Sequence, residues 1–200
     1  CEDGGISSSC NFEVPPYPEA VDLGLPSGTK WASLNIGAFD SLDSGISFAW
    51  GEIAMKSYYS WENYKFHSLG FYENNTIEFS KYNWNDGKAA LELTDDAAHV
   101  HWGDNWSVPT YEDWLELFAN CTVSKTTLNG INGLLVVSDV TNQSIMIPDA
   151  YHWSSSLTPG KDYAYNVPHL AQYAMAFNPI DALGKDEYRY IALPIRPVMK

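Results

Sequence analysis

Two histidines stand two residues apart at the start of HVHWGDNWSVPTYEDWLELF, residues 99–118. Residues two apart on a strand face the same way, so His99 and His101 would offer a metal two nitrogen ligands. A transition-metal site needs three or four ligands and groups that orient them. Nearby carboxylates are Asp95, Asp96 and Asp104. Their direction does not follow from the sequence, and we favour histidines that face solvent or are hydrogen-bonded within the scaffold.

A serine nucleophile is the second chemistry to weigh. The stretch HWSSSL places Ser154, Ser155 and Ser156 close to His152. A serine triad also needs an acid that orients the base, together with an oxyanion hole. No Gly-x-Ser-x-Gly pattern frames these serines. We therefore predict a structural strand here, no catalytic residue, and a protein that is not an enzyme.

Charge and composition narrow the class of partner. The 200 residues carry 11 Lys and Arg against 25 Asp and Glu, a net charge of −14. Nucleic acid and anionic membrane surfaces repel such a chain. Glycans or extracellular proteins are more plausible partners, although plain solubility of an exported protein explains the charge equally well.

The three cysteines bear on export. The chain begins CEDGGISSSC, which resembles the mature N-terminus of a bacterial lipoprotein, where Cys1 would be acylated. The alternative is that Cys1 merely marks where the sequence was cut. Cys10 and Cys121 remain, and whether they pair stays open. On the lipoprotein interpretation the protein is exported and anchored by lipid at the outer membrane, facing the cell exterior. This anchor would be its only link to the membrane.

The elements that must position these residues follow from local patterns. Residues 1–18 are rich in Gly, Ser and Pro and indicate a flexible spacer, which leaves 19–200 as one domain. Thr110 and Asp113 resemble a capping box. The apolar residues behind them recur at helical spacing, at Tyr111, Trp114, Leu115 and Phe118. This is the clearest helix signal in the chain.

Beyond this helix the pattern has the two-residue period of strands. GLLVVS and SIMIP, joined by DVTNQ, predict a hairpin, and YHWSSS, QYAMAF and YRYIALPIRPV predict further strands. One main helix followed by short antiparallel strands and long loops is typical of an α+β domain.

Several blocks in order resemble a known family. They are VDLGLPSGTKWASLNIGA, FAWGE, DDAAHVHWGDNWSVPTYEDWLEL, NGINGLLVVS, SIMIP, HWSSSL and IRPV. Together they resemble the Fibrobacter succinogenes major paralogous domain of Bacteroidetes and Fibrobacter surface proteins, over about residues 20–198. The resemblance implies a C-type-lectin-like fold, related to formylglycine-generating enzymes: a small twisted antiparallel sheet, about two helices and long irregular loops. Family members often carry a longer insertion where this chain has only DAYH.

The resemblance also bears on chemistry. Trp102, Trp106 and Trp114 lie in shared blocks, so we favour core packing over sugar stacking. Formylglycine-generating enzymes need a late pair of cysteines, and this chain has no cysteine after Cys121. The tripeptide Trp84-Asn85-Asp86 matches a calcium and sugar motif of C-type lectins, but it precedes the helix and is taken as a turn. No metal or cofactor is predicted, and calcium held by other oxygens stays a lesser alternative.

The remaining signal is an excess of aromatic side chains. Thirteen Tyr and eight Trp exceed what one such core needs, and both suit recognition of sugars or proteins. Late strands and loops carry one candidate group: Tyr163, Tyr165, His169, Tyr173, Tyr188 and Tyr190. A loop before the helix carries the second: Tyr58, Tyr59, Trp61 and Tyr64. We expect a binding or adhesion module for glycan or protein. The alternatives are a structural subunit of a surface assembly, an enzyme acting on extracellular glycan, or loops that merely pack on themselves.

Overall fold

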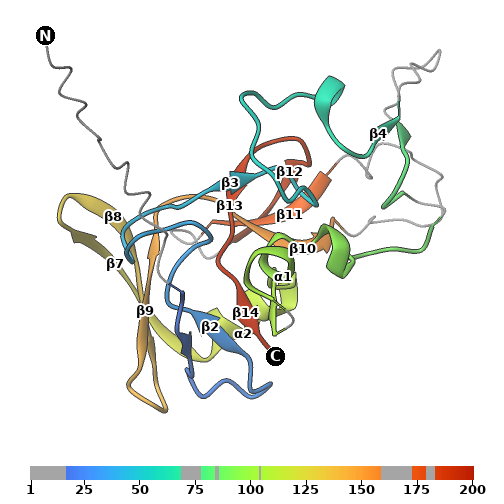
Figure 1. The fold of residues 1–200 in the computed structure, drawn as a ribbon. Helices are drawn as coiled ribbons and strands as arrows, with labels where there is room; N and C mark the ends of the chain where they lie inside the picture. The colour runs from blue at the N-terminus through green and yellow to red at the C-terminus, as the bar shows by residue number, and fades with distance from the viewer. Residues whose placement is uncertain (1–16, 69–77, 84–85, 104, 159–172, 179–182) are drawn as a thin grey trace, which may run out of the picture.

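A computed structural model gives the fold, and it describes residues 17–68, 78–83, 86–103, 105–158, 173–178 and 183–200 (Figure 1). Within these residues the chain is α+β: two α-helices accompany small sheets whose strand pairs are all antiparallel. The α+β prediction is confirmed. In Figure 1 the sheet of β7, β8 and β9 lies on one side of the molecule and β4 on the opposite side.

The first sheet joins the beginning and the end of the described chain. Its strand order is β1 (Ala20–Val21), β2 (Lys30–Ala32), β14 (Val198–Met199) and β6 (Trp106–Ser107). Val198 pairs with Trp31 on one side and Ser107 on the other. The end of the closing IRPV segment therefore lies inside this sheet, between β2 and β6.

The predicted hairpin is present, with a third strand that the sequence analysis missed. β8 (Ile131–Ser138) pairs with β9 (Ser144–Pro148) on one edge and with β7 (Cys121–Leu128) on the other. Asn129 and Gly130 both have positive φ, as a tight hairpin turn requires. β7 was missed by the sequence analysis because most of its side chains are exposed and polar, so no apolar alternation marks the strand.

The two helices begin at side-chain caps. α2 (Tyr111–Ala119) begins after Thr110, whose hydroxyl accepts from the Asp113 amide at 3.1 Å, while the Asp113 carboxylate accepts from the Thr110 amide at 2.7 Å. This confirms the predicted capping box. α1 (Ala97–Trp102) is capped by Asp96, which accepts from the His99 amide.

The remaining elements surround the aromatic half of the core. One sheet has the order β10 (His152–Leu157), β11 (Tyr173–Asn178), β12 (Leu183–Tyr188). The shorter elements are β3 (Ser47–Phe48) paired with β13 (Leu193–Pro194), β4 (His67–Ser68) paired with β5 (Glu78–Phe79), and the 3₁₀ turns η1 (Trp61–Asn63) and η2 (Leu93–Asp95). YRYIALPIRPV is thus not one strand as expected, because the chain turns at Tyr188–Ile191.

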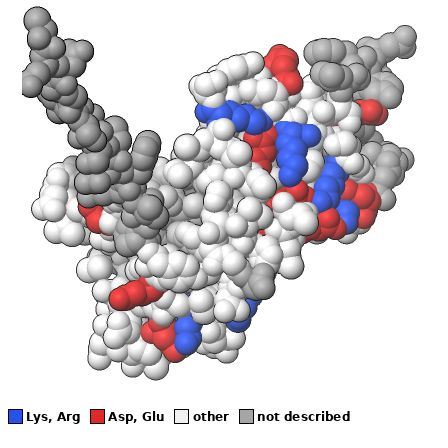
Figure 2. All heavy atoms as spheres, in the orientation of Figure 1, with Lys and Arg blue, Asp and Glu red and all other residues white. Residues whose placement is uncertain are grey.

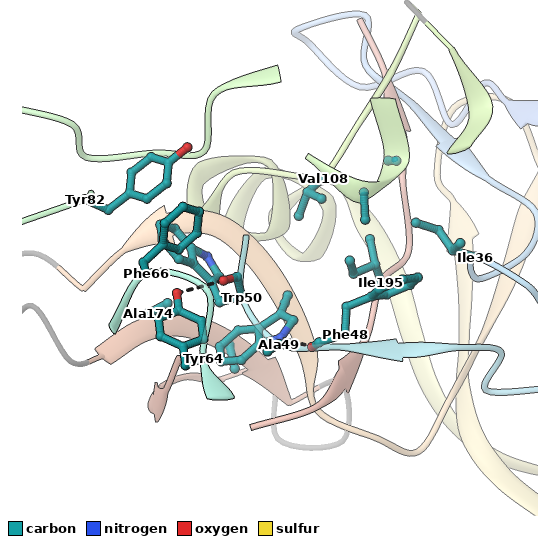
Figure 3. Packing of buried hydrophobic residues seen from close by; sticks show 14 of the residues in the cluster. Ile36, Phe48, Ala49, Trp50, Tyr64, Phe66, Tyr82, Val108, Ala174 and Ile195 are labelled. Atoms are coloured by element: carbon teal, nitrogen blue, oxygen red, sulfur yellow. Dashed lines mark hydrogen bonds between the residues drawn. The ribbon is translucent and has the colours of Figure 1, made fainter. Parts of the chain in front are cut away.

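Large rings fill two buried clusters. One contains Phe48, Trp50 and Tyr64, and Figure 3 shows these side chains lying close together. The other contains Trp114, which stacks on Phe177 at 5.2 Å between ring centroids. Trp106 and Trp114 are buried, which confirms their expected role in the core, while Trp102 is partly buried and packs against the first cluster.

A buried polar network ties the sheets together. The Arg196 guanidinium donates to Asn35 Oδ1 at 2.7 Å, to the Ala32 carbonyl of β2 at 3.0 Å and to the Met146 carbonyl of β9 at 2.8 Å. Asn35 Nδ2 lies 3.2 Å from Nε2 of His152 in β10. The fully buried Arg196 therefore links two sheets directly and reaches a third through Asn35.

The segment predicted as a spacer reaches the domain at its end. Tyr17 accepts a hydrogen bond from the Trp106 indole at 2.9 Å and donates to the Trp102 carbonyl at 3.2 Å. Cys121 is a free, buried thiol in the described part of the chain, and its possible partner Cys10 lies outside the described residues.

Candidate functional site

The predicted site residues fall into three classes in the structure. Tyr163, Tyr165 and His169 lie outside the described residues, as do Cys1, Trp84 and Asn85. Tyr173 is placed by its backbone, opposite Tyr188 across β11 and β12. The other six lie in described parts of the chain: Tyr58, Tyr59, Trp61, Tyr64, Tyr188 and Tyr190.

The structure brings together the two aromatic groups that were proposed separately. The Trp61 ring lies 5.8 Å from Tyr188 and 4.7 Å from Tyr190, both edge-on. Tyr188 and Tyr190 stack on each other at 5.8 Å with 19° between their planes. We name these three side chains the Trp61 platform.

The platform is a surface feature with a buried base. Tyr188 is 36% exposed, and Trp61 and Tyr190 are half-buried. Beneath Trp61 lies the Phe79 ring, 5.5 Å away and buried. Tyr58, which is 65% exposed, lies three residues before η1 and accepts a hydrogen bond from Asn63 Nδ2 through its carbonyl. Aromatic faces are therefore accessible at this part of the surface.

Tyr64 and Tyr59 do not belong to this surface in the same way. Tyr64 is only 3% exposed and donates its hydroxyl hydrogen bond to the Trp50 carbonyl at 2.8 Å (Figure 3), so its selection as a ligand contact is corrected to a core role. Burial raises the pKa of the Tyr64 hydroxyl. Tyr59 is half-buried and donates to the Ser47 carbonyl at 3.0 Å, which fixes the loop to β3.

Hydrogen bonds hold the loop that carries Trp61. Asn63 Oδ1 accepts from the Ser60 amide at 3.0 Å and thereby closes the 3₁₀ turn. Lys56 donates to the Asn63 carbonyl and forms an ion pair with the buried Glu52 carboxylate at 2.6 Å. Glu52 also accepts from the Lys65 amide at 2.7 Å. The irregular segment therefore holds the Trp61 ring without regular secondary structure.

A network of charged side chains surrounds Asp95. Asp95 is buried and accepts from Lys65 at 2.6 Å, from Lys81, and from the Tyr82 hydroxyl at 2.7 Å. Burial alone would raise the pKa of the Asp95 carboxyl, but the hydrogen bonds from both lysines outweigh it and lower the pKa. Burial raises the pKa of Tyr82 to about 12. These groups neutralise one another, and Figure 2 shows basic and acidic side chains side by side at the upper right of the molecule.

Arg189 is a site residue that the sequence analysis missed. Its guanidinium carbon lies 3.7 Å from the centroid of the Phe79 ring, and the side chain is fully buried. Burial lowers the pKa of Arg189 to about 10. The available signal was the YRY triplet, in which an arginine stands between the two platform tyrosines.

The histidine and serine motifs have structural roles. His99 and His101 lie in α1 and not on a strand, so residues two apart point to different sides, about 200° around the helix axis. His101 Nε2 bonds the Ile53 carbonyl at 2.8 Å. His152 is buried and contacts Ala150 and Asn35, while the Ser154 hydroxyl donates to the Met175 carbonyl at 2.7 Å. His152 and Ser154 therefore do not form a nucleophile–base pair.

Two further observations concern metals and membranes. In the part of the chain that the structure describes, no three His, Cys, Asp or Glu side chains are grouped to hold a metal ion. Asp86 of the Trp84-Asn85-Asp86 motif accepts from the amides of Tyr82 and Lys88, as a turn residue does. The described helices are all too short or too polar to cross a membrane.

Comparison of the chain with protein-family models, with curated proteins and with solved structures found no match.

Proposed function

We propose that the protein is a non-catalytic binding module that recognises a glycan through the Trp61 platform. The observation that carries the proposal is the contact of Trp61 with Tyr188 and Tyr190 at a partly exposed surface. Sugar rings present flat apolar C–H faces, which pack on aromatic faces, and their hydroxyl groups bond to nearby polar groups. Tyrosine and tryptophan lose little conformational entropy on binding because they have few rotatable bonds.

The proposal also covers the cellular location of the protein and the family to which its fold belongs. The protein would be an exported lipoprotein of the outer membrane, anchored through Cys1 and facing the exterior. Its domain would be C-type-lectin-like and of the Fibrobacter succinogenes major paralogous type. Supporting features are the CEDGG start, the ordered motif blocks and the net charge of −14, which disfavours nucleic acid as a partner. An extracellular protein is the alternative partner, because aromatic surfaces also suit protein contacts.

Binding by a platform variant tests the proposal. Glycan-array screening of the whole chain selects a ligand, and calorimetry then compares the wild type with Tyr188→Ala. We expect affinity to fall about two- to tenfold, since one aromatic contact contributes about 0.5–1.5 kcal/mol. Tyr17→Ala is the matched control, because Tyr17 is also exposed but contacts Trp106, outside the platform.

Four outcomes would overturn the proposal. An array without any bound glycan removes the ligand class, and equal losses in both tyrosine variants remove the platform. Concentration-dependent self-association in sedimentation, together with no glycan binding, would point instead to a structural subunit. Turnover of a bound glycan would show that the module is an enzyme.

A further inference from the structure

Arg189 is a buried cation whose hydrogen bonding is incomplete. Its Nη1 donates to the Tyr82 carbonyl at 3.1 Å, whereas the buried Nε and Nη2 have no hydrogen-bond partner among the described residues. Within the described residues no carboxylate forms an ion pair with it. Burial lowers the pKa of Arg189, and the charge of Asp86 offsets this only in part; the Asp86 carboxylate already accepts from two backbone amides.

The second buried arginine shows what a completed site looks like. Arg196 is also fully buried without an ion pair in the described chain, yet Nε, Nη1 and Nη2 each donate to an oxygen. A buried donor without a partner destabilises a protein, and a buried charge does so more strongly. All three nitrogens of Arg196 are hydrogen-bonded, as expected of a structural residue. Two nitrogens of Arg189 have no acceptor among the described residues, so a structural role alone does not explain it.

Contacts with aromatic rings do not satisfy the remaining hydrogen-bond donors of Arg189. The Phe79 face lies against the guanidinium at 3.7 Å, with the Trp50 and Tyr64 rings at 5.4 and 5.7 Å. A stacked ring attracts the charge across the flat face of the guanidinium. The N–H donors point outward in its plane, so stacking on Phe79 leaves them without acceptors.

The two donor groups that lack a partner in the described chain, Nε and Nη2, lie on the same edge of the guanidinium. Nε–H and Nη2–H of an arginine point the same way and form the side-on fork that binds a carboxylate through two parallel hydrogen bonds. The third nitrogen, Nη1, already donates to the Tyr82 carbonyl. The unpaired atoms of Arg189 are thus the pair that matches a carboxylate.

Arg189 lies next to the proposed ligand surface. Arg189 is flanked in the chain by Tyr188 and Tyr190, and the Phe79 ring on which it stacks contacts Trp61 at 5.5 Å. The turn is held in place because the Arg189 carbonyl accepts from the Trp50 amide at 2.8 Å. A cation therefore lies one ring layer beneath the platform.

We infer that Arg189 anchors an acid-recognising subsite and that the glycan carries a carboxylate, as a uronic acid does. This inference rests on the proposed function, since it names the class of sugar that the Trp61 platform would bind. Arg189 is fully buried without ligand, so the carboxylate enters only when neighbouring side chains move aside. The partly exposed rings of Tyr188 and Tyr190 are the adjacent side chains in the chain.

The test compares an acidic sugar with uncharged analogues of similar shape. Thermal denaturation and calorimetry of the whole chain are run with glucuronate, with its methyl ester and with glucose at constant ionic strength. We expect glucuronate to bind wild type about ten- to a hundredfold more tightly than either neutral sugar, because paired hydrogen bonds to a charge are strong. Arg189→Lys keeps the charge but lacks the fork, and we expect it to lose this preference.

Stability of the ligand-free protein separates a binding role from a structural one. Arg189→Met removes an unpaired buried charge, so we expect its melting midpoint to equal or exceed that of the wild type. Arg196→Met abandons three oxygen acceptors, and we expect its midpoint to fall.

Each contrary result overturns the inference. A midpoint for Arg189→Met as low as that of Arg196→Met makes Arg189 structural, and equal binding of acid and ester removes the subsite. If neutral glycans bind in a Tyr188-dependent way while acids gain nothing, the proposed function survives and this inference alone fails. If no sugar of either kind binds, both fail.

Discussion

Among single residues, His152 shows how burial sets a protonation state. The imidazole is fully buried, Nδ1 bonds the Ala150 carbonyl at 2.8 Å, and Nε2 faces the Asn35 amide. Because a carbonyl can only accept and the amide nitrogen can only donate, the neutral form with the proton on Nδ1 satisfies both. Burial and the nearby Arg196 charge lower the pKa of His152 to about 3.

This lowered pKa predicts a specific acid sensitivity. The unfolded chain takes up a proton on His152 below its ordinary pKa of about 6.5, whereas the folded protein does not until about pH 3. The contribution of His152 to stability is therefore constant above about pH 6.5 and falls toward pH 3, with a slope of up to about 1.4 kcal/mol per pH unit. Urea unfolding at several pH values between 4.5 and 7 measures this slope, above the range in which Asp95 contributes.

Two histidine variants check its origin. His152→Gln keeps an acceptor for Asn35 and has no titrating group, so its stability should vary much less over this range. His101→Gln, which alters an exposed histidine, should keep the wild-type slope. A wild-type slope that survives in His152→Gln would contradict the assignment.

At the level of secondary structure, the three-stranded sheet β7–β8–β9 depends on Gly133. This glycine is required for space, because its φ is not positive. A Cβ on Gly133 would lie 2.4 Å from the Ile147 carbonyl oxygen and 2.6 Å from the Met146 methyl group. The strand register places Gly133 opposite Pro148 and Thr126. The close approach of β9 therefore excludes any side chain here.

We expect Gly133→Ala to destabilise the protein by about 1–3 kcal/mol, because backbone atoms have to shift to admit the methyl group. Denaturant unfolding measures the loss. Gly130→Asn is the control: Gly130 has open space around it, and asparagine tolerates the positive φ of this turn. Equal stability of wild type and Gly133→Ala would show that β9 does not lie this close to β8.

For the whole molecule, the dominant electrostatic feature is its net charge of −14. The described lysines around Asp95 and Glu92 are paired with carboxylates, so they do not offset the remaining acidic groups. Like charges repel one another more strongly in the compact state than in the unfolded chain. Self-repulsion therefore opposes folding at neutral pH.

Salt should relieve this repulsion. Raising sodium chloride from low concentration to about 0.5 M shortens the screening length to a few ångströms, and we expect the melting midpoint at pH 7 to rise by about 2–4 °C. The effect should vanish near pH 4.5, close to the isoelectric point. A midpoint that falls with salt would mean that the ion pairs around Asp95 outweigh the net repulsion.

Local patterns predicted the elements whose signals lie within a few residues. The capping box of Thr110 and Asp113, the helix behind it and the hairpin of GLLVVS with SIMIP all appear in the structure. The apolar stripe was wrong at Leu115, which is 45% exposed, whereas Leu117 is buried in its place. The strand of 121–128 and the turn at Tyr188–Ile191 were missed, because their residues carry no period that separates strand from loop.

The sequence by itself determined the α+β class, the main helix, the acidic surface and the surplus of aromatic residues. Only the tertiary structure decided which rings are exposed and which meet. Trp61 contacts Tyr188 and Tyr190, while Tyr64, three residues from Trp61, is buried. The reason is physical: a ring's exposure depends on what packs over it, and the segments that pack here are far apart in the chain.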